Sequence, residues 1–91
     1  MKKIMLFYLA DCPYCHNAQR ALTELKEENS AYHEIEMEWI EESRQPDLAK
    51  QYDYYYVPSI FNEGRKLYEA DPSEDYFSIK ENIRAALDAV L

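Results

Sequence analysis

The amino-acid sequence predicts a single α/β domain over residues 1–91 with the element order βαβαββα. A nearly continuous apolar run close to the N-terminus is typical of a strand covered on both faces. A strong helical stripe reaches the C-terminus, and a hairpin pattern around Glu63-Gly64 precedes it. A chain of 91 residues buries roughly 60–65% of its unfolded surface, which allows one modest core and places any chemistry near the surface.

The first half of the chain predicts a strand at 3–9 and a helix that starts at Pro13, where the missing N–H of proline is no loss. Helical spacing continues to about residue 29. Alternating side chains over 32–37 predict a second strand with one solvated face. Residues 38–52 are expected to be helical and divided by Pro46, with Trp39 beneath the helix.

The second half predicts a short strand over 57–62, opened by Pro58, that turns at Glu63-Gly64 and pairs with a strand at 65–69. Asp71-Pro72 is expected to begin the last helix, with Asp71 as its cap. The helical stripe then continues to the C-terminus through Tyr76, Ile79, Ile83, Leu87 and Val90.

Charge and composition exclude several classes of partner. The formal net charge is −8, and no basic run exists beyond Lys2-Lys3 and Arg65-Lys66, so we expect neither nucleic acid nor anionic membrane as a partner. No apolar stretch approaches the ~20 residues of a membrane span, and a single glycine excludes a glycine-rich phosphate loop. The start of the chain lacks a complete export signal, so we expect a cytoplasmic protein.

Two cysteines in a cytoplasmic chain favour redox or metal chemistry over a structural disulfide. Cys12-Pro13-Tyr14-Cys15 lies where the first strand becomes a helix. Unpaired N–H groups and the helix dipole stabilise a thiolate at that place. We therefore expect Cys12 to be the exposed nucleophile and Cys15, one turn deeper, to be the buried resolving thiol.

The immediate neighbours of the dithiol leave its acidity open. Asp11 brings a negative charge close to the dithiol, whereas a protonated His16 brings a positive one, and the sequence does not give the geometry of either. The alternative to redox chemistry is a zinc site or an inert pair. A structural zinc site needs four ligands, and the chain has only two cysteines and two histidines, with His33 in another predicted strand. We therefore predict a redox pair and no metal.

At this point the sequence resembles a glutaredoxin, within the thioredoxin-fold superfamily, over essentially the whole chain. The Cys-Pro-Tyr-Cys motif is that of a dithiol glutaredoxin, and other matches support it. They are His16, Ala18, Leu48 nine residues before Val57, the Val57-Pro58 pair, Phe61, and the acidic Asp71 after the last strand.

The resemblance implies a thioredoxin-like fold, a four-stranded mixed sheet with helices on both faces. It implies thiol–disulfide exchange, in which Cys12 attacks a substrate disulfide and Cys15 resolves the mixed disulfide. Pro58 is expected to be cis and to lie against the active site, and the backbone of Val57 to pair with the substrate. Pro13 and Tyr14 complete the expected substrate-binding surface.

The chain departs from the family at the glutathione contacts. Leu9 stands where glutaredoxins carry a lysine, Tyr68-Glu69 where they carry Gly-Gly, and Tyr56 where they carry threonine. Of the family's contacts, Gln45, Val57 and Asp71 remain. Loss of one charge-assisted contact removes ~1.5–3 kcal/mol, or about ten- to a hundredfold in affinity. Glu69 adds bulk and repels an anionic tripeptide.

We therefore predict a monomeric oxidoreductase that reduces protein disulfides and is recharged by a thioredoxin reductase or a non-glutathione thiol. No cofactor is expected, glutathione being the one candidate. One alternative is a conventional glutathione-dependent glutaredoxin. Another is a dimeric iron–sulfur or metal-binding scaffold that uses Cys12 from two chains.

Clustered tyrosines precede Pro58, and their role has two interpretations. Tyr52, Tyr54, Tyr55 and Tyr56, with Tyr8 and Tyr14 nearby, form either an aromatic rim that grips a protein substrate or a loop packed onto the second helix with wet hydroxyl groups.

Overall fold

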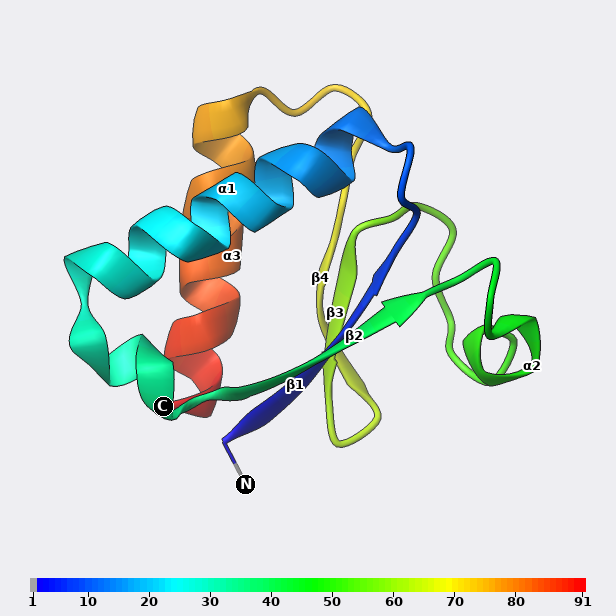
Figure 1. Cartoon of the computed structure of the whole chain (residues 1–91), viewed down its shortest axis with the longest axis horizontal. Coiled ribbons are helices and arrows are strands. Elements are labelled where there is room, and N and C mark those ends of the chain that lie inside the picture. Colours follow the sequence, from blue (N-terminus) through cyan, green and yellow to red (C-terminus); the bar gives the residue numbers. More distant parts are fainter. Residues whose placement is uncertain (1) are drawn as a thin grey trace.

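The sheet is mixed and four-stranded, with the strand order β2-β1-β3-β4. The structure is a computed structural model and describes residues 2–91. The central strand β1 (Lys3–Tyr8) pairs parallel with β2 (Glu36–Glu41) and antiparallel with β3 (Ser59–Asn62). The edge strand β4 (Arg65–Glu69) pairs antiparallel with β3, as the hairpin pattern predicts (Figure 1).

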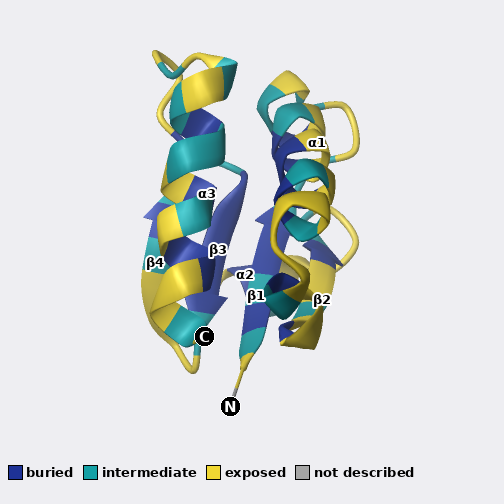
Figure 2. Cartoon of the chain, turned by 90° about the vertical axis from the view of Figure 1, so that its left-hand side faces the viewer, coloured by how far each residue is buried: buried dark blue, intermediate teal, exposed yellow. Residues whose placement is uncertain are grey.

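Helices cover both faces of this sheet, which confirms the expected architecture. The long helices α1 (Pro13–Glu28) and α3 (Tyr76–Val90) lie side by side on one face (Figure 2). The single-turn helix α2 (Pro46–Ala49) lies on the other. The side chains of β1 alternate between the two faces of the sheet, so the core has two parts. Ile4 and Leu6 face the long helices, whereas Phe7 lies in a smaller cluster on the opposite face.

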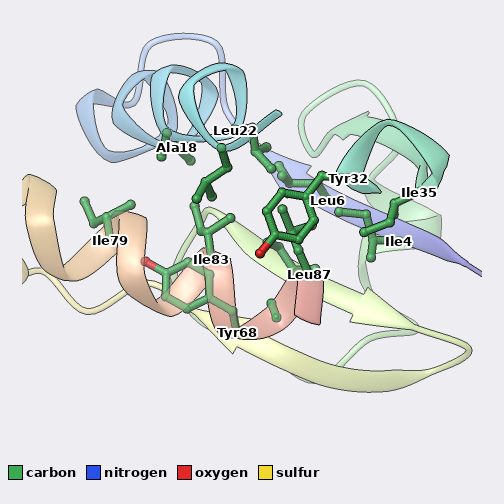
Figure 3. Close-up of a cluster of buried hydrophobic side chains, with 14 of the residues drawn as sticks. Ile4, Leu6, Ala18, Leu22, Tyr32, Ile35, Tyr68, Ile79, Ile83 and Leu87 are labelled. Carbon is green, nitrogen blue, oxygen red and sulfur yellow. The ribbon is translucent and has the colours of Figure 1, made fainter. Parts of the chain in front are cut away.

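The larger part of the core fills the space between the two long helices and the sheet (Figure 3). Its buried side chains come from both helices and from three strands, among them Leu22, Ile60, Tyr68, Ile83 and Leu87. Burial of such apolar surface contributes roughly 25 cal/mol per Å². This cluster fixes α1 on the sheet, and with it the Cys-Pro-Tyr-Cys motif at the N-terminus of α1.

The smaller cluster on the opposite face decides the role of two tyrosines. Phe7 lies 5.0 Å, centroid to centroid, from both Tyr52 and Tyr54. These two rings therefore pack inward, as the second interpretation expects, but onto the sheet and not mainly onto the second helix. Their hydroxyl groups donate to Met5 Sδ and to the Glu42 carboxylate, so the expectation of wet hydroxyl groups is wrong. Tyr55 and Tyr56 are instead 92% and 52% exposed, so only this part of the tyrosine cluster points into solvent.

The strand predicted over 32–37 is correct only in its last two residues, 36 and 37. Residues Ser30–Glu34 form a 3-10 helix, which starts where the Asn29 side chain accepts a hydrogen bond from the Ala31 N–H. Tyr32 is buried in this turn and donates its hydroxyl to Asp88 of α3 at 2.6 Å. Because this anchored turn occupies residues 30–34, β2 begins only at Glu36, which pairs with Lys3 of β1.

The helix expected over 38–52 is also wrong in most of its length. Trp39 lies in β2 instead of beneath a helix, and its ring packs nearly perpendicular to the Tyr8 ring at a centroid distance of 5.8 Å. Parallel pairing with β1 holds this segment extended. Helical structure is confined to α2, where Pro46 occupies the first turn.

The last helix begins later than predicted. Its N-cap is Asp75, whose carboxylate accepts a hydrogen bond from the Ser78 N–H at 2.8 Å, and not Asp71. Asp71 instead accepts from the backbone and hydroxyl of Ser73 in the preceding turn. The strand expected from Val57 starts at Ser59. None of the helices in residues 2–91 is long and apolar enough to cross a membrane.

Candidate active site: the Cys12–Cys15 dithiol

Cys12 is the N-cap residue of α1, in extended conformation, and Pro13 follows it in the first helical turn. The carbonyl of Cys12 accepts hydrogen bonds from the N–H groups of Cys15 and His16, each at 3.1 Å. The half-buried thiol therefore stands at the positive end of the helix dipole. A helix N-terminus attracts negative charge, and the thiolate is the nucleophilic form of cysteine.

The thiol of Cys12 faces the segment before β3. Its Sγ donates to the Val57 carbonyl oxygen at 3.7 Å. The Val57-Pro58 peptide bond is cis, which confirms that expectation, and Pro58 itself is buried. The fold thus brings Cys12, Val57 and Pro58 together from positions that are 45 and more residues apart in the sequence. Both cysteines are free thiols.

Cys15 is 1% exposed. Burial is the main reason that its pKa is raised to about 12, and the neighbouring Cys12 raises the pKa further. The N–H of Leu9, 3.5 Å from Cys15 Sγ, opposes this shift by stabilising the thiolate. Cys15 is therefore held as a neutral thiol, whereas Cys12 is accessible at the helix end. The two environments match a nucleophile and a resolving thiol.

Tyr14 connects the start of α1 with the turn before α3. Its hydroxyl donates to the Pro72 carbonyl at 2.8 Å, which brings Asp71 toward the same end of the molecule. The carboxylate of Asp71 is already used by Ser73. Pro13 is exposed beside Cys12. The substrate-binding roles of these residues remain predictions.

Gln45 is exposed at the start of α2, where its carbonyl accepts from the Ala49 N–H at 3.0 Å. No hydrogen bond within residues 2–91 connects it with Cys12. The surface beside Cys12 is a cavity of about 370 Å³ whose lining includes no basic side chain. Its lining consists of Leu9, Ala10, Asp11, Cys12, Glu41 and Ser43.

Sequence reasoning missed the structural role of Glu69. Its Oε2 accepts hydrogen bonds from the N–H groups of Tyr55 and Tyr56 at 2.8 and 2.9 Å, and its Oε1 pairs with Lys66 Nζ at 2.7 Å. The Lys66 interaction, together with the two amides, lowers the pKa of Glu69 to about 2. Only the i,i+3 spacing from Lys66 was visible in the sequence.

The histidines have other partners or lie in solvent. His16 Nε2 donates to the Ala10 carbonyl at 2.7 Å, and His33 is exposed in the 3-10 helix. Within residues 2–91, no three side chains of histidine, cysteine, aspartate or glutamate gather where they could hold a metal ion. A cluster shared between two chains would have to draw on Cys12, the more accessible cysteine.

Comparison with known proteins identifies the family and the fold. The glutaredoxin family model matches residues 4–67. A structure described as that of a malarial protein has 14% identity and a TM-score of 0.65, covering 98% of this chain and 96% of its own. Thioredoxin 1 from Thermosipho africanus TCF52B has 16% identity and a TM-score of 0.60, with 96% of both chains covered.

A third structure, oxidised mitochondrial thioredoxin 3 from Saccharomyces cerevisiae, has 20% identity and a TM-score of 0.61. The similarity covers 90% of this chain and 76% of that one. These structures support a thioredoxin-like fold. Comparison with curated protein sequences gives no match.

Proposed function

Because the chain belongs to the glutaredoxin family, we propose that it reduces protein disulfides through Cys12 and Cys15. The observation that carries the proposal is the contrast between the two thiols. Cys12 is half-buried at a helix N-terminus beside Val57, and Cys15 is buried one turn below. In this proposal the protein acts in the cytoplasm as a monomer and needs no bound cofactor.

The exchange proceeds in two balanced steps. The Cys12 thiolate attacks one sulfur of the substrate disulfide, and the other substrate sulfur leaves as a thiolate that takes a proton from water. The Cys15 thiol then gives its proton to water and attacks Cys12 Sγ, which breaks the mixed disulfide and releases the second substrate thiolate, and this thiolate in turn takes up a proton. The substrate gains two electrons, and the protein is left with a Cys12–Cys15 disulfide.

The environment of Cys15 suits this order of events. While Cys12 is ionised, its charge adds to the effect of burial and keeps the Cys15 pKa high. Once Cys12 is part of a mixed disulfide, that repulsion disappears. The Leu9 N–H remains in place to stabilise the developing Cys15 thiolate. Resolution is therefore favoured after the first step and disfavoured before it.

The finer part of the proposal concerns the reductant that restores the dithiol. The cavity beside Cys12 has Leu9 in place of a cation and includes Asp11 and Glu41. Hydrogen bonds from Ser43 lower the pKa of Glu41, which is therefore ionised at neutral pH. This surface repels an anionic thiol such as glutathione, so we favour a thioredoxin reductase or a thiol without net negative charge.

An exchange of electron sources tests the proposal. One disulfide substrate is reduced with NADPH and thioredoxin reductase, and separately with NADPH, glutathione and glutathione reductase. Turnover with thioredoxin reductase alone supports the proposed reductant, and strong turnover with glutathione identifies a conventional glutaredoxin. Cys12→Ser should abolish turnover in either system. Cys15→Ser should accumulate the mixed disulfide, and normal rates in Cys12→Ser would refute the mechanism.

A further inference from the structure

The segment over 53–57 lies between α2 and β3 and has no regular secondary structure, yet it ends at the residue that faces Cys12. A substrate that forms a mixed disulfide with Cys12 must approach Val57. The hydrogen bonds of residues 2–91 leave the Val57 N–H unused, so a substrate backbone has a donor available there. The position of this segment therefore matters for any peptide or protein substrate.

Glu69 holds this segment from the neighbouring edge strand. Two consecutive amides, of Tyr55 and Tyr56, donate to one oxygen of its carboxylate, and Lys66 Nζ donates to the other. Such charge-assisted bonds are roughly twice as strong as neutral ones. The Glu69 side chain is 22% exposed, so water screens these contacts less than it screens a surface ion pair.

The backbone around Glu69 fixes where its carboxylate can reach. Glu69 stands opposite Ser59 in the β3–β4 ladder, and the Ala70 N–H donates to the Pro58 carbonyl at 3.0 Å. The Ser59 hydroxyl donates to the Tyr56 carbonyl at 2.6 Å. The end of β4 is thus bonded to both sides of Val57, and Glu69 supplies the charged part of that contact.

We propose that Glu69 is a positioning residue for thiol–disulfide exchange with polypeptide substrates. By binding the amides of Tyr55 and Tyr56, its carboxylate keeps the Val57 backbone where a substrate chain meets Cys12. The proposal rests on the proposed function. A peptide disulfide uses the Val57 backbone and depends on Glu69, whereas a small disulfide that reaches only the Cys12 thiol does not.

The test compares two disulfides in single-turnover reactions of the pre-reduced protein, so that no reductase is involved. One substrate is a disulfide-linked peptide and the other is bis(2-hydroxyethyl) disulfide. Acid-quenched samples are separated by chromatography, and the thiol derived from the substrate is quantified apart from the protein over a range of substrate concentrations. Glu69→Ala should raise the half-saturating peptide concentration about tenfold, the loss expected from charge-assisted bonds. Its rate with the small disulfide should stay within about twofold of wild type, since the thiol is untouched.

Two further variants separate positioning from general stability. Glu69→Gln keeps an acceptor oxygen on a side chain of the same length and should restore part of the peptide affinity. Glu28→Ala removes a glutamate that pairs with Lys80 and Arg84 between the long helices, and it should leave both reactions unchanged. Circular dichroism and urea unfolding confirm that each variant is folded.

The inference would be overturned if Glu69→Ala reacted with the peptide disulfide as wild type does, or if it lost activity equally with both disulfides. It would also be overturned if Glu28→Ala showed the same loss of peptide affinity. A wild-type protein that reacts with neither disulfide would instead refute the proposed function. Failure of the two proposals is therefore distinguishable. Should Glu69→Ala fail to fold, Glu69→Gln still decides the question, because reduced peptide affinity without a change for the small disulfide supports positioning.

Discussion

The contrast between the two thiols makes a quantitative prediction about Cys15. In the folded, reduced protein, alkylation of Cys15 by iodoacetamide should be much slower than alkylation of the same residue in the unfolded chain. Only the thiolate reacts, and burial raises the pKa of Cys15 from 9.0 to about 12. Cys12 has no comparable burial and should be alkylated first.

The size of the effect follows from two opposing terms. A pKa of about 12 in place of 9.0 lowers the thiolate fraction at neutral pH about 1,000-fold. A more basic thiolate is also a better nucleophile, with a Brønsted coefficient of ~0.4–0.5, which returns roughly 16- to 32-fold. The balance is a rate about 30- to 60-fold below that of the unfolded chain. The 1% exposure of Cys15 slows the reaction further.

The assay is pulsed alkylation of the reduced protein, followed by digestion and mass spectrometry of the peptide that carries both cysteines. The same pulse in concentrated urea supplies the reference rate for each thiol. Cys12→Ser isolates Cys15 as the only thiol of the chain and excludes exchange between the two sites. Because part of the pKa shift comes from Cys12, labelling of Cys15 should be somewhat faster in this variant than in wild type.

Equal labelling of Cys15 in the folded and unfolded states would refute the assignment of Cys15 as the protected thiol. Labelling of Cys15 before Cys12 would reverse the proposed roles. Either result would also remove the physical basis for the two-step exchange, because the order of attack depends on the difference between the thiols.

Three further predictions concern stability, each measured by urea unfolding. Leu22→Ala, at a core position that is 2% exposed, should lower the free energy of unfolding by ~2–5 kcal/mol, and a loss below ~1 kcal/mol would contradict the packing of α1. Asp75→Ala should lower it by ~0.5–2 kcal/mol through loss of the N-cap bond to Ser78, whereas the matched Asp71→Ala should not fray α3. Because the pKa of Glu69 is lowered from 4.5 to about 2, its ionised form stabilises the fold above pH 4.5. This contribution to the free energy of unfolding, up to about 3 kcal/mol, disappears as the pH falls toward 2. In Glu69→Gln the free energy of unfolding should therefore fall less steeply between pH 4.5 and pH 2 than in wild type. An unchanged pH dependence would contradict the hydrogen bonds assigned to Glu69.

Local signals predicted the parts of the fold that carry strong, redundant patterns. The apolar run became β1, Pro13 opens α1, and the β3–β4 hairpin turns at Glu63-Gly64, where both residues have positive φ. The family and the fold also follow from the sequence, because the Cys-Pro-Tyr-Cys motif and Val57-Pro58 carry the resemblance. The family match over residues 4–67 and the thioredoxin-like neighbours confirm them.

The segment between α1 and β3 could not be predicted, because its pattern does not distinguish helix from strand. In β2 only Ile40 is buried, so its apolar residues repeat with neither the spacing of a helix nor that of a strand. The strand exists because β1 offers an unpaired edge on that side. The position of the preceding 3-10 helix depends likewise on the hydrogen bond from Tyr32 to Asp88 in α3.

The sequence by itself determined the family and the place of the two cysteines at the N-terminus of α1, since both follow from the Cys-Pro-Tyr-Cys motif and its neighbours. Tertiary structure decided how the site is held. The amides of Tyr55 and Tyr56 lie 14 and 13 residues from Glu69, and only the β3–β4 ladder brings the carboxylate to them. The same holds for Cys12 and Val57, since contacts between distant segments depend on the packing of the whole sheet.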